Sequence, residues 1–228
     1  MQKHLIIANW KANKSLEEVG AWFAKVGPYS KNLESVTLVV CPPVIYLPTA
    51  YQLIMGNGYK LELGSQDLSQ FDSGPFTGEV SARQISQFTS YTIIGHSERR
   101  RHLMETADII ADKVEMALQF GLNPVFCLDE HQKSELLPFV DKPVIAAYET
   151  PSAISSNPGA APEDPAKAAE ICQSFQSILK KGRVIYGGSV EPATVTNYLS
   201  QPAISGVLVS KASLSADQFI ELVEASIF

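Results

Sequence analysis

Short apolar runs alternate with polar turns and helical stripes along almost the whole chain. Each run ends in a polar or glycine-bearing turn, after which apolar residues return at helical spacing, and the unit recurs eight times. Strands that alternate with helices in this way favour a parallel sheet. The strands we expect are His4 to Asn9, Thr37 to Cys41, Lys60 to Gln66, Tyr91 to Gly95, Asn123 to Cys127, Pro143 to Tyr148, Arg183 to Tyr186 and Gly206 to Val209.

The helix starts carry local signals. Ser15 with Glu18, and Ser215 with Gln218, have the spacing of a capping box, in which each side chain bonds the other residue's backbone. Pro162 is expected in the first turn of another helix, because proline is favoured there. The apolar stripe of that helix comprises Ile171, Phe175, Ile178 and Leu179, and it ends at Gly182.

Eight strand-helix units predict a closed eight-stranded parallel β/α barrel, an α/β fold, rather than an open doubly wound sheet. No GxGxxG motif follows any strand, which also argues against a dinucleotide-binding sheet. The fifth unit is the weakest, because only His131 to Val140 is available for its helix, which must be shortened or irregular. At 228 residues, the chain fits one domain, residues 1–228.

Composition narrows the classes of function. A net charge of −6 and a pI near 5.3 argue against nucleic acid, whose phosphates need clustered Lys and Arg. We expect no leader, because the first strand begins near His4, and no membrane span, because no apolar stretch reaches about 18 residues. The three cysteines, Cys41, Cys127 and Cys172, lack metal-finger or CxxC spacing and are expected to be buried thiols. These features predict a cytoplasmic protein.

Polar residues stand where several strands end, which is where barrel enzymes place their catalytic groups. They include Lys11, His96, Glu149 and the turn Gly187-Gly188. Each alone has an ordinary structural interpretation: a solvated cation, a turn histidine, a rim carboxylate, a tight turn. Together they supply a cation, an acid or electrophile, a base and an anion-binding turn. That set suits proton abstraction beside a carbonyl of a phosphorylated substrate.

Several segments then resemble one family, in the right order and over most of the chain. They are NWKAN (Asn9 to Asn13), FTGEVS (Phe76 to Ser81), IGHSERR (Ile94 to Arg100), AYE (Ala147 to Glu149), YGGSV (Tyr186 to Val190) and LVSKASL (Leu208 to Leu214). This combination is similar to the triosephosphate isomerase family. The resemblance implies interconversion of dihydroxyacetone phosphate and glyceraldehyde 3-phosphate through an enediol, a reaction of glycolysis and gluconeogenesis.

The resemblance also implies roles for single residues. Glu149 would be the carbon base, His96 would polarise the carbonyl, Lys11 would offset the substrate's charge and Asn9 would bind a substrate oxygen. Glu98 resembles a supporting acid beside His96, with an ion pair to a neighbouring Lys or Arg as the alternative.

Phosphate would be held mainly by backbone amides. The expected residues are Ser155 in the lid, Gly188 and Ser189, and Ser210 and Lys211 at a short helix start. We expect no metal and no cofactor, because the His, Cys and carboxylate spacing offers no ligand cluster and the reaction needs no redox group.

The chain departs from the family pattern in three places. The lid segment, Thr150 to Asn157, lacks the glycines of the family's tip, and Ser210-Lys211 stands where two glycines are expected. Lys211 would either add charge to the phosphate site or crowd it. CLDE (Cys127 to Glu130) replaces CIGE, and the shortened fifth helix is similar to compact archaeal members, which are tetramers.

FTGEVS resembles the loop that reaches into a neighbouring subunit's site. Thr77 and Glu79 therefore imply a homodimer, in which Thr77 meets Asn9 and Lys11 across the interface, with a homotetramer as the alternative. Two other functions stay open: isomerisation of another small phosphosugar, suggested by Lys211 and the glycine-poor lid, and a barrel that binds phosphometabolites with little catalysis.

Overall fold

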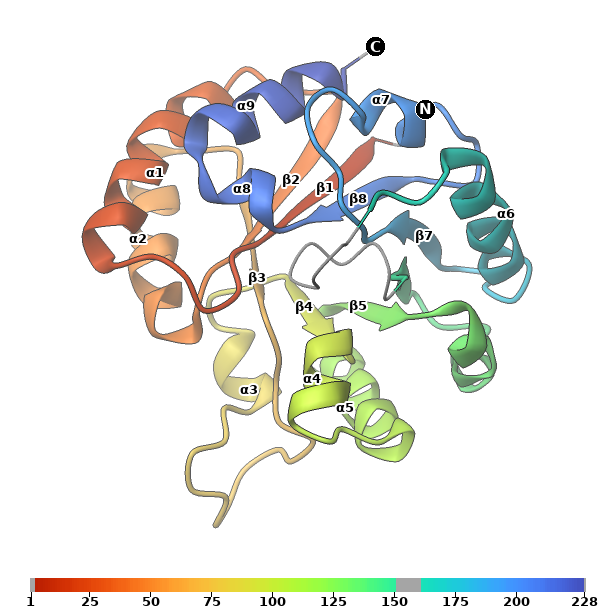
Figure 1. Cartoon of the computed structure of the whole chain (residues 1–228). Helices are drawn as coiled ribbons and strands as arrows, with labels where there is room; N and C mark the ends of the chain where they lie inside the picture. The colour runs from red at the N-terminus through yellow and green to blue at the C-terminus, as the bar shows by residue number, and fades with distance from the viewer. Residues whose placement is uncertain (1–2, 151–160, 228) are drawn as a thin grey trace.

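Eight parallel strands close into a barrel in which each strand pairs with the next and β8 pairs with β1 (Figure 1). This computed structural model describes residues 3–150 and 161–227. The strands are β1 (His4–Asn9), β2 (Val36–Cys41), β3 (Glu62–Ser65), β4 (Tyr91–Ile94), β5 (Asn123–Leu128), β6 (Ile145–Tyr148), β7 (Arg183–Tyr186) and β8 (Gly206–Val209). The predicted fold is confirmed, and each predicted strand coincides or overlaps with an observed one.

Helices surround the barrel (Figure 1). They are α1 (Leu16–Ser30), α2 (Leu47–Asn57), α3 (Ala82–Ile85), α4 (Ser97–His102), α5 (Ala107–Gln119), α6 (Pro165–Gln176), α7 (Val195–Leu199), α8 (Lys211–Leu214) and α9 (Ala216–Ala225), with 3-10 helices η1 (Val44–Tyr46) and η2 (Glu130–Phe139). No helix in the described part of the chain is long and apolar enough to cross a membrane.

The fifth unit is irregular, as predicted, because its helix is the 3-10 helix η2 with Pro138 inside it. The capping box of Ser15 and Glu18 is confirmed. At the last helix, the Ser215 side chain accepts the Gln218 N–H, which confirms the start of α9.

The prediction for the sixth helix was wrong at both ends. Asp164 is the N-cap and Pro165, not Pro162, occupies the first turn. The Asp164 carboxylate accepts the N–H groups of Ala166 and Lys167, and this bonding fixes the start three residues later than the proline rule suggested. The helix ends at Gln176, so Ile178 and Leu179 pack from the turn beyond it rather than from the helical stripe.

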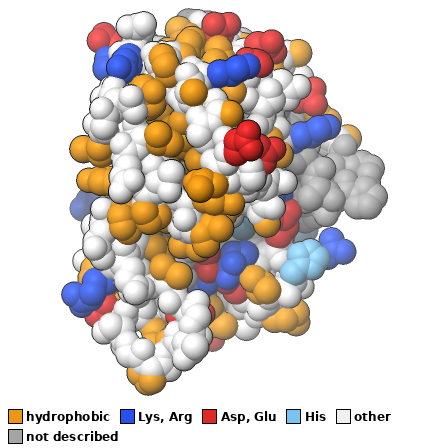
Figure 2. All heavy atoms as spheres, turned by 90° about the vertical axis from the view of Figure 1, so that its left-hand side faces the viewer, with side chains coloured by type: hydrophobic (Ala, Val, Ile, Leu, Met, Phe, Trp, Pro, Cys, Tyr) orange, Lys and Arg blue, Asp and Glu red, His pale blue; other side chains and the backbone are white. Residues whose placement is uncertain are grey.

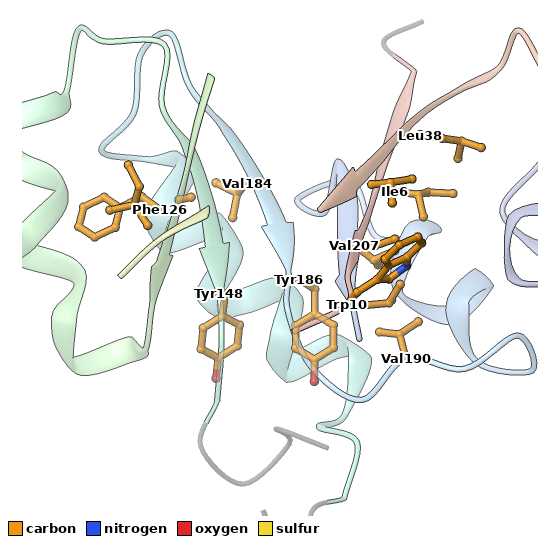
Figure 3. Packing of buried hydrophobic residues seen from close by; sticks show 14 of the residues in the cluster. Ile6, Trp10, Leu38, Phe126, Tyr148, Val184, Tyr186, Val190 and Val207 are labelled. Carbon is orange, nitrogen blue, oxygen red and sulfur yellow. The ribbon is translucent and has the colours of Figure 1, made fainter. Parts of the chain in front are cut away.

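Apolar side chains fill two layers. One cluster lies inside the barrel and includes Ile7, Val39, Cys127 and Ile185. The larger cluster lies between the strands and the helices, where Trp10, Phe126, Tyr148 and Tyr186 pack (Figure 3). Because neighbouring strand residues point to opposite faces, each strand serves both layers, and the polar residues at the strand ends are left at the barrel mouth.

Candidate active site

The carboxyl ends of the strands surround one pocket. It is lined by Asn9, Lys11, His96, Glu149, Gly187, Gly188, Leu208, Val209 and Ser210. These residues follow or end β1, β4, β6, β7 and β8, so strands distant in sequence contribute to one cavity. The structure brings together most of the residues that the sequence singled out.

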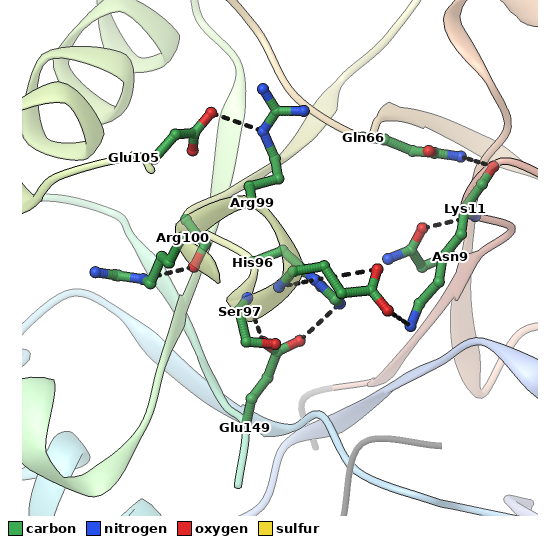
Figure 4. A network of polar contacts seen from close by, with 11 residues as sticks. Asn9, Lys11, Gln66, His96, Ser97, Arg99, Arg100, Glu105 and Glu149 are labelled. Atoms are coloured by element: carbon green, nitrogen blue, oxygen red, sulfur yellow. Dashed lines mark hydrogen bonds and ion pairs between the residues drawn. The ribbon is translucent and has the colours of Figure 1, made fainter. Parts of the chain in front are cut away.

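Glu149 and His96 face one another in this pocket (Figure 4). Both residues are buried, with 3% of Glu149 and 7% of His96 exposed. Glu149 Oε1 lies 3.2 Å from His96 Nε2, and Glu149 Oε2 accepts the Ser97 N–H at 3.2 Å. A buried carboxylate is thereby held directly beside an imidazole.

His96 caps α4. Its Nδ1 accepts the Glu98 N–H at 3.2 Å, so the start of the helix is satisfied by the imidazole. An accepting nitrogen carries no hydrogen, and the ring therefore presents Nε2–H towards Glu149.

Lys11 has an unusual backbone and a defined side chain. Its φ of 52° lies in the left-handed region, where a non-glycine residue is strained. Its N–H donates to Asn9 Oδ1 at 3.0 Å, and its Nζ donates to Glu98 Oε1 at 2.6 Å. Glu98 Oε2 lies 3.7 Å from His96 Nδ1. Of the two interpretations of Glu98, the ion pair with a lysine is the closer contact.

Gln66 was missed by the sequence analysis. Its Nε2 donates to the backbone carbonyls of Lys11 and Cys41, both at 2.9 Å. Gln66 follows β3 and contacts both the loop after β1 (Figure 4) and the end of β2, so it connects three strands. The one feature of the sequence that could have indicated a role for Gln66 is its position at the end of a predicted strand.

Gly187 and Cys127 are small neighbours of Glu149. A Cβ on Gly187 would lie 3.0 Å from Glu149 Cγ, closer than most such contacts, so a larger residue there would require Glu149 to shift by a few tenths of an ångström. Cys127 is fully buried, and burial, followed by the Glu149 charge, raises the pKa of its thiol well above the usual value. Cys127 therefore remains a protonated neighbour of the carboxylate, as its expected role as a buried thiol requires.

The predicted phosphate residues lie around the same mouth, with exceptions. Gly188 and Ser210 line the pocket. Ser189 is half-buried beside Gly188, and Lys211 is exposed and does not line the pocket. Ser155 lies outside the described residues. Among the described residues, no group of three or more His, Cys, Asp or Glu is placed to hold a metal ion.

Thr77 and Glu79 belong to the loop between β3 and α3, residues 66–81, which protrudes from the barrel (Figure 1), and neither residue lines the pocket. Both are exposed. Within the loop, the rings of Phe71 and Phe76 stack at a centroid distance of 3.9 Å, and Asp72 connects the loop to α3 through an ion pair with Arg83 at 2.7 Å.

A network of charged side chains connects α4 to the neighbouring segments. Arg99 of α4 contacts Asp67 at 2.6 Å and Glu105 at 2.7 Å. Lys113 of α5 binds the same two carboxylates at 2.7 and 2.6 Å. Burial raises the pKa of Asp67 although both cations act in the opposite direction. The helix that His96 caps is thus fixed to the segment after β3 and to α5.

The buried carboxylate-imidazole pair at the carboxyl end of the barrel is typical of a β/α-barrel enzyme. A family model described as "Triosephosphate isomerase" matches residues 4–226. The chain is 36% identical to "Triosephosphate isomerase" of Hahella chejuensis, with all of both chains covered. It is 33% identical to the protein of that name from a Shewanella species and 32% identical to that of Shewanella amazonensis, each alignment covering 97% of this chain and 96% of the relative. The chain belongs to the triosephosphate isomerase family.

Proposed function

We propose that this protein interconverts dihydroxyacetone phosphate and glyceraldehyde 3-phosphate, with Glu149 as the carbon base and His96 as the polarising group. The observation that carries this proposal is the buried Glu149 carboxylate 3.2 Å from His96 Nε2, in one pocket with Lys11. The names of the relatives support the same reaction.

The reaction moves one proton between adjacent carbons. Glu149 takes the proton from the carbon beside the carbonyl, and the C–H electron pair forms the enediol double bond while the carbonyl electrons move to oxygen. His96 donates Nε2–H to that oxygen and then exchanges protons between the two enediol oxygens. Glu149 returns its proton to the other carbon, so atoms and charge balance over the cycle.

Lys11 and backbone amides would offset the negative charge of the substrate. Lys11 lies in the pocket and, when substrate binds, would exchange part of its contact with Glu98 for a substrate oxygen, while Asn9 binds a second oxygen. Gly188, Ser189, Ser210 and Lys211 would present N–H groups to the phosphate, and Ser155 would complete the site from the lid. Because Lys211 is exposed, its side chain would act as a distant charge rather than crowd the phosphate.

The residues of the pocket favour catalysis over binding alone. A barrel that only binds phosphometabolites has no use for a buried base beside an imidazole. The relatives reported above carry the name triosephosphate isomerase, which favours the triose phosphate over a larger phosphosugar.

Replacing the base tests the proposal. In Glu149→Gln, kcat in a coupled assay with glyceraldehyde 3-phosphate should fall by at least about 10²-fold, since the amide cannot accept the carbon proton. KM should change little, because the amide has nearly the same shape. Glu170→Gln, which alters an exposed carboxylate of α6, is the matched control and should keep full activity. Wild-type turnover that survives Glu149→Gln would disprove the assignment.

Our proposal for assembly is a homodimer of single-domain chains in the cytoplasm. Large apolar side chains are exposed after several strands, notably Ile45 at 73% and Met104 at 75%, with Leu16, Val44 and Phe71. Figure 2 shows hydrophobic side chains gathered on one face of the molecule, above the protruding loop. A large exposed apolar patch favours burial against a partner, and Thr77 and Glu79 would enter the partner's site. Light scattering should give twice the chain mass of 24.8 kDa, and a fourfold mass would support the tetramer instead.

A further inference from the structure

The side chain of Lys14 connects two parts of the barrel mouth. Lys14 lies in the loop after β1, and its Nζ donates to the backbone carbonyl of Leu214 at 2.6 Å. Leu214 is the last residue of α8, which lies beside this loop (Figure 1). The ammonium also lies 4.9 Å from the centroid of the Trp10 ring, so it is placed by two contacts.

The backbone of Lys14 is strained. Its φ is 76°, in the region where glycine is preferred. A non-glycine residue remains in that region only when its surroundings favour it, and such residues are concentrated at functional sites. Lys11, three residues earlier, has the same left-handed character, so one short loop contains both strained lysines.

The bond from Lys14 stabilises a very short helix. α8 comprises one turn, Lys211–Leu214, and its carbonyls have no further turn to bond. Lys14 satisfies Leu214, and the Trp22 Nε1–H satisfies the Ser213 carbonyl at 3.0 Å. Ser213 Oγ in turn donates to the Ser210 carbonyl at 2.6 Å. These bonds connect the loop and α1 to Ser210, which lines the pocket.

We propose that Lys14 is a positioning residue that fixes the Ser210 turn relative to Lys11 and thereby sets the affinity of the site for phosphate. The proposal rests on the assigned triose phosphate function. Both ends of the connection lie at the pocket: Lys11 in the loop that contains Lys14, and Ser210 at the start of α8. Lys14 itself does not line the pocket, so it acts through the position of α8.

The surroundings of the Lys14 ammonium favour its bond to the Leu214 carbonyl. Burial lowers the pKa of Lys14, while the charge of Glu18 acts in the opposite direction. A half-buried cation that has lost part of its hydration is stabilised by a carbonyl at the negative end of a helix. Loss of the ammonium should therefore release Leu214 and loosen the turn that begins at Ser210.

Two variants and a control test the proposal in the full-length protein. Lys14→Met keeps the aliphatic stem and removes the donor, and Lys14→Gly also relieves the left-handed strain, so the fold should be retained in at least one. Lys25→Met is the control, because it removes the same charge from a lysine that pairs with Asp217 on α9. Steady-state kinetics with glyceraldehyde 3-phosphate and calorimetric titration with inorganic phosphate are the two measurements.

Both Lys14 variants should raise KM and the phosphate dissociation constant about fivefold, with kcat within about twofold, because binding is lost and the chemistry is not. Lys25→Met should leave all three unchanged. Equal effects in Lys14→Met and Lys25→Met would indicate net charge and would overturn the proposal, as would a fall in kcat with unchanged KM. If the wild type does not turn over triose phosphate, the function fails, but weaker phosphate binding in both Lys14 variants would still support the positioning role.

Discussion

The left-handed backbone of Lys11 is held by a side chain from another strand. Gln66 donates to the Lys11 and Cys41 carbonyls, and both acceptors lie at the mouth of the barrel. In Gln66→Leu, the Lys11 carbonyl loses this donor and the strained loop can relax. We expect kcat/KM to fall about tenfold, mostly through KM, because one misplaced charged contact is worth about 1–2 kcal/mol.

The control for this variant is Gln87→Leu, which alters an exposed glutamine whose side chain donates to the nearby Arg83 carbonyl. Steady-state kinetics on the two proteins should separate loss of the Lys11 contact from a general loss of amide groups. If Gln66→Leu retains the wild-type KM, the strained loop does not depend on this bond.

The residues at the strand ends were predictable because their positions depend only on where each apolar run stops. His96, Glu149 and Lys11 meet this condition, and they line one pocket. Gln66 also stands at a strand end, but its partners are two backbone carbonyls on other strands. Its contacts depend on the register of the barrel, and the residue type alone does not specify them. The ion pair between Lys11 and Glu98 also depends on the register of the barrel, because the two residues are 87 positions apart in the chain.

At the scale of elements, the position of α4 depends on ionic contacts that are withdrawn from water. Lys113 is only 6% exposed at its side chain and binds Asp67 and Glu105. In Lys113→Met, two carboxylates share Arg99 alone in a partly buried environment. We expect the free energy of unfolding to fall by about 3 kcal/mol, because removing one partner of a buried pair leaves uncompensated charge.

Urea denaturation of Lys113→Met and Lys25→Met measures this difference. Lys25 pairs with Asp217, but both side chains are more than half exposed, so its replacement should cost less than about 1 kcal/mol. Equal losses of unfolding free energy in the two variants would show that the buried contacts of Lys113 stabilise the protein no more than an exposed ion pair does.

The elements differ in how well local pattern determined them. Strands were placed correctly because apolar runs bounded by turns have few alternatives in a closed parallel barrel. The predicted start of α6 was wrong because Pro162, Asp164 and Pro165 are all of a type that favours a helix start. The hydrogen bonds that the Asp164 side chain accepts fix the start at Pro165. The 3-10 form of η2 follows from the shortness of the segment between β5 and β6, which the sequence did indicate.

At the scale of the molecule, the two ends of the barrel have different chemistry. The carboxyl ends of the strands surround the pocket, whereas the amino ends contain His4 of β1 and Arg183 of β7. Arg183 donates to the backbone carbonyls of Lys3 and Ser205, so it connects β7 to the segments before β1 and β8. A change at that end should alter stability without altering the catalytic residues.

His4 makes that stability depend on pH. Burial, and then the charge of Arg183, lower the pKa of His4 below its ordinary value of 6.5. The unfolded chain therefore binds a proton at His4 more readily than the folded chain does. The contribution to stability is fully present above pH 6.5 and is lost as the pH falls through that value towards the lower pKa of the folded state. The urea midpoint should accordingly be lower at about pH 5.5 than at about pH 7.5.

In His4→Gln, which cannot take up the proton, the difference between the two midpoints should become smaller, at one fixed protein concentration so that assembly does not contribute. His131→Gln provides the matched comparison, because the His131 side chain is 85% exposed and its replacement should leave the pH difference as in the wild type. If the His4 variant retains the full pH difference, the dependence originates elsewhere, and the amino end of the barrel does not sense protons. If the difference between the urea midpoints becomes smaller in His4→Gln while KM and kcat stay at wild-type values, the amino end of the barrel affects stability but not catalysis.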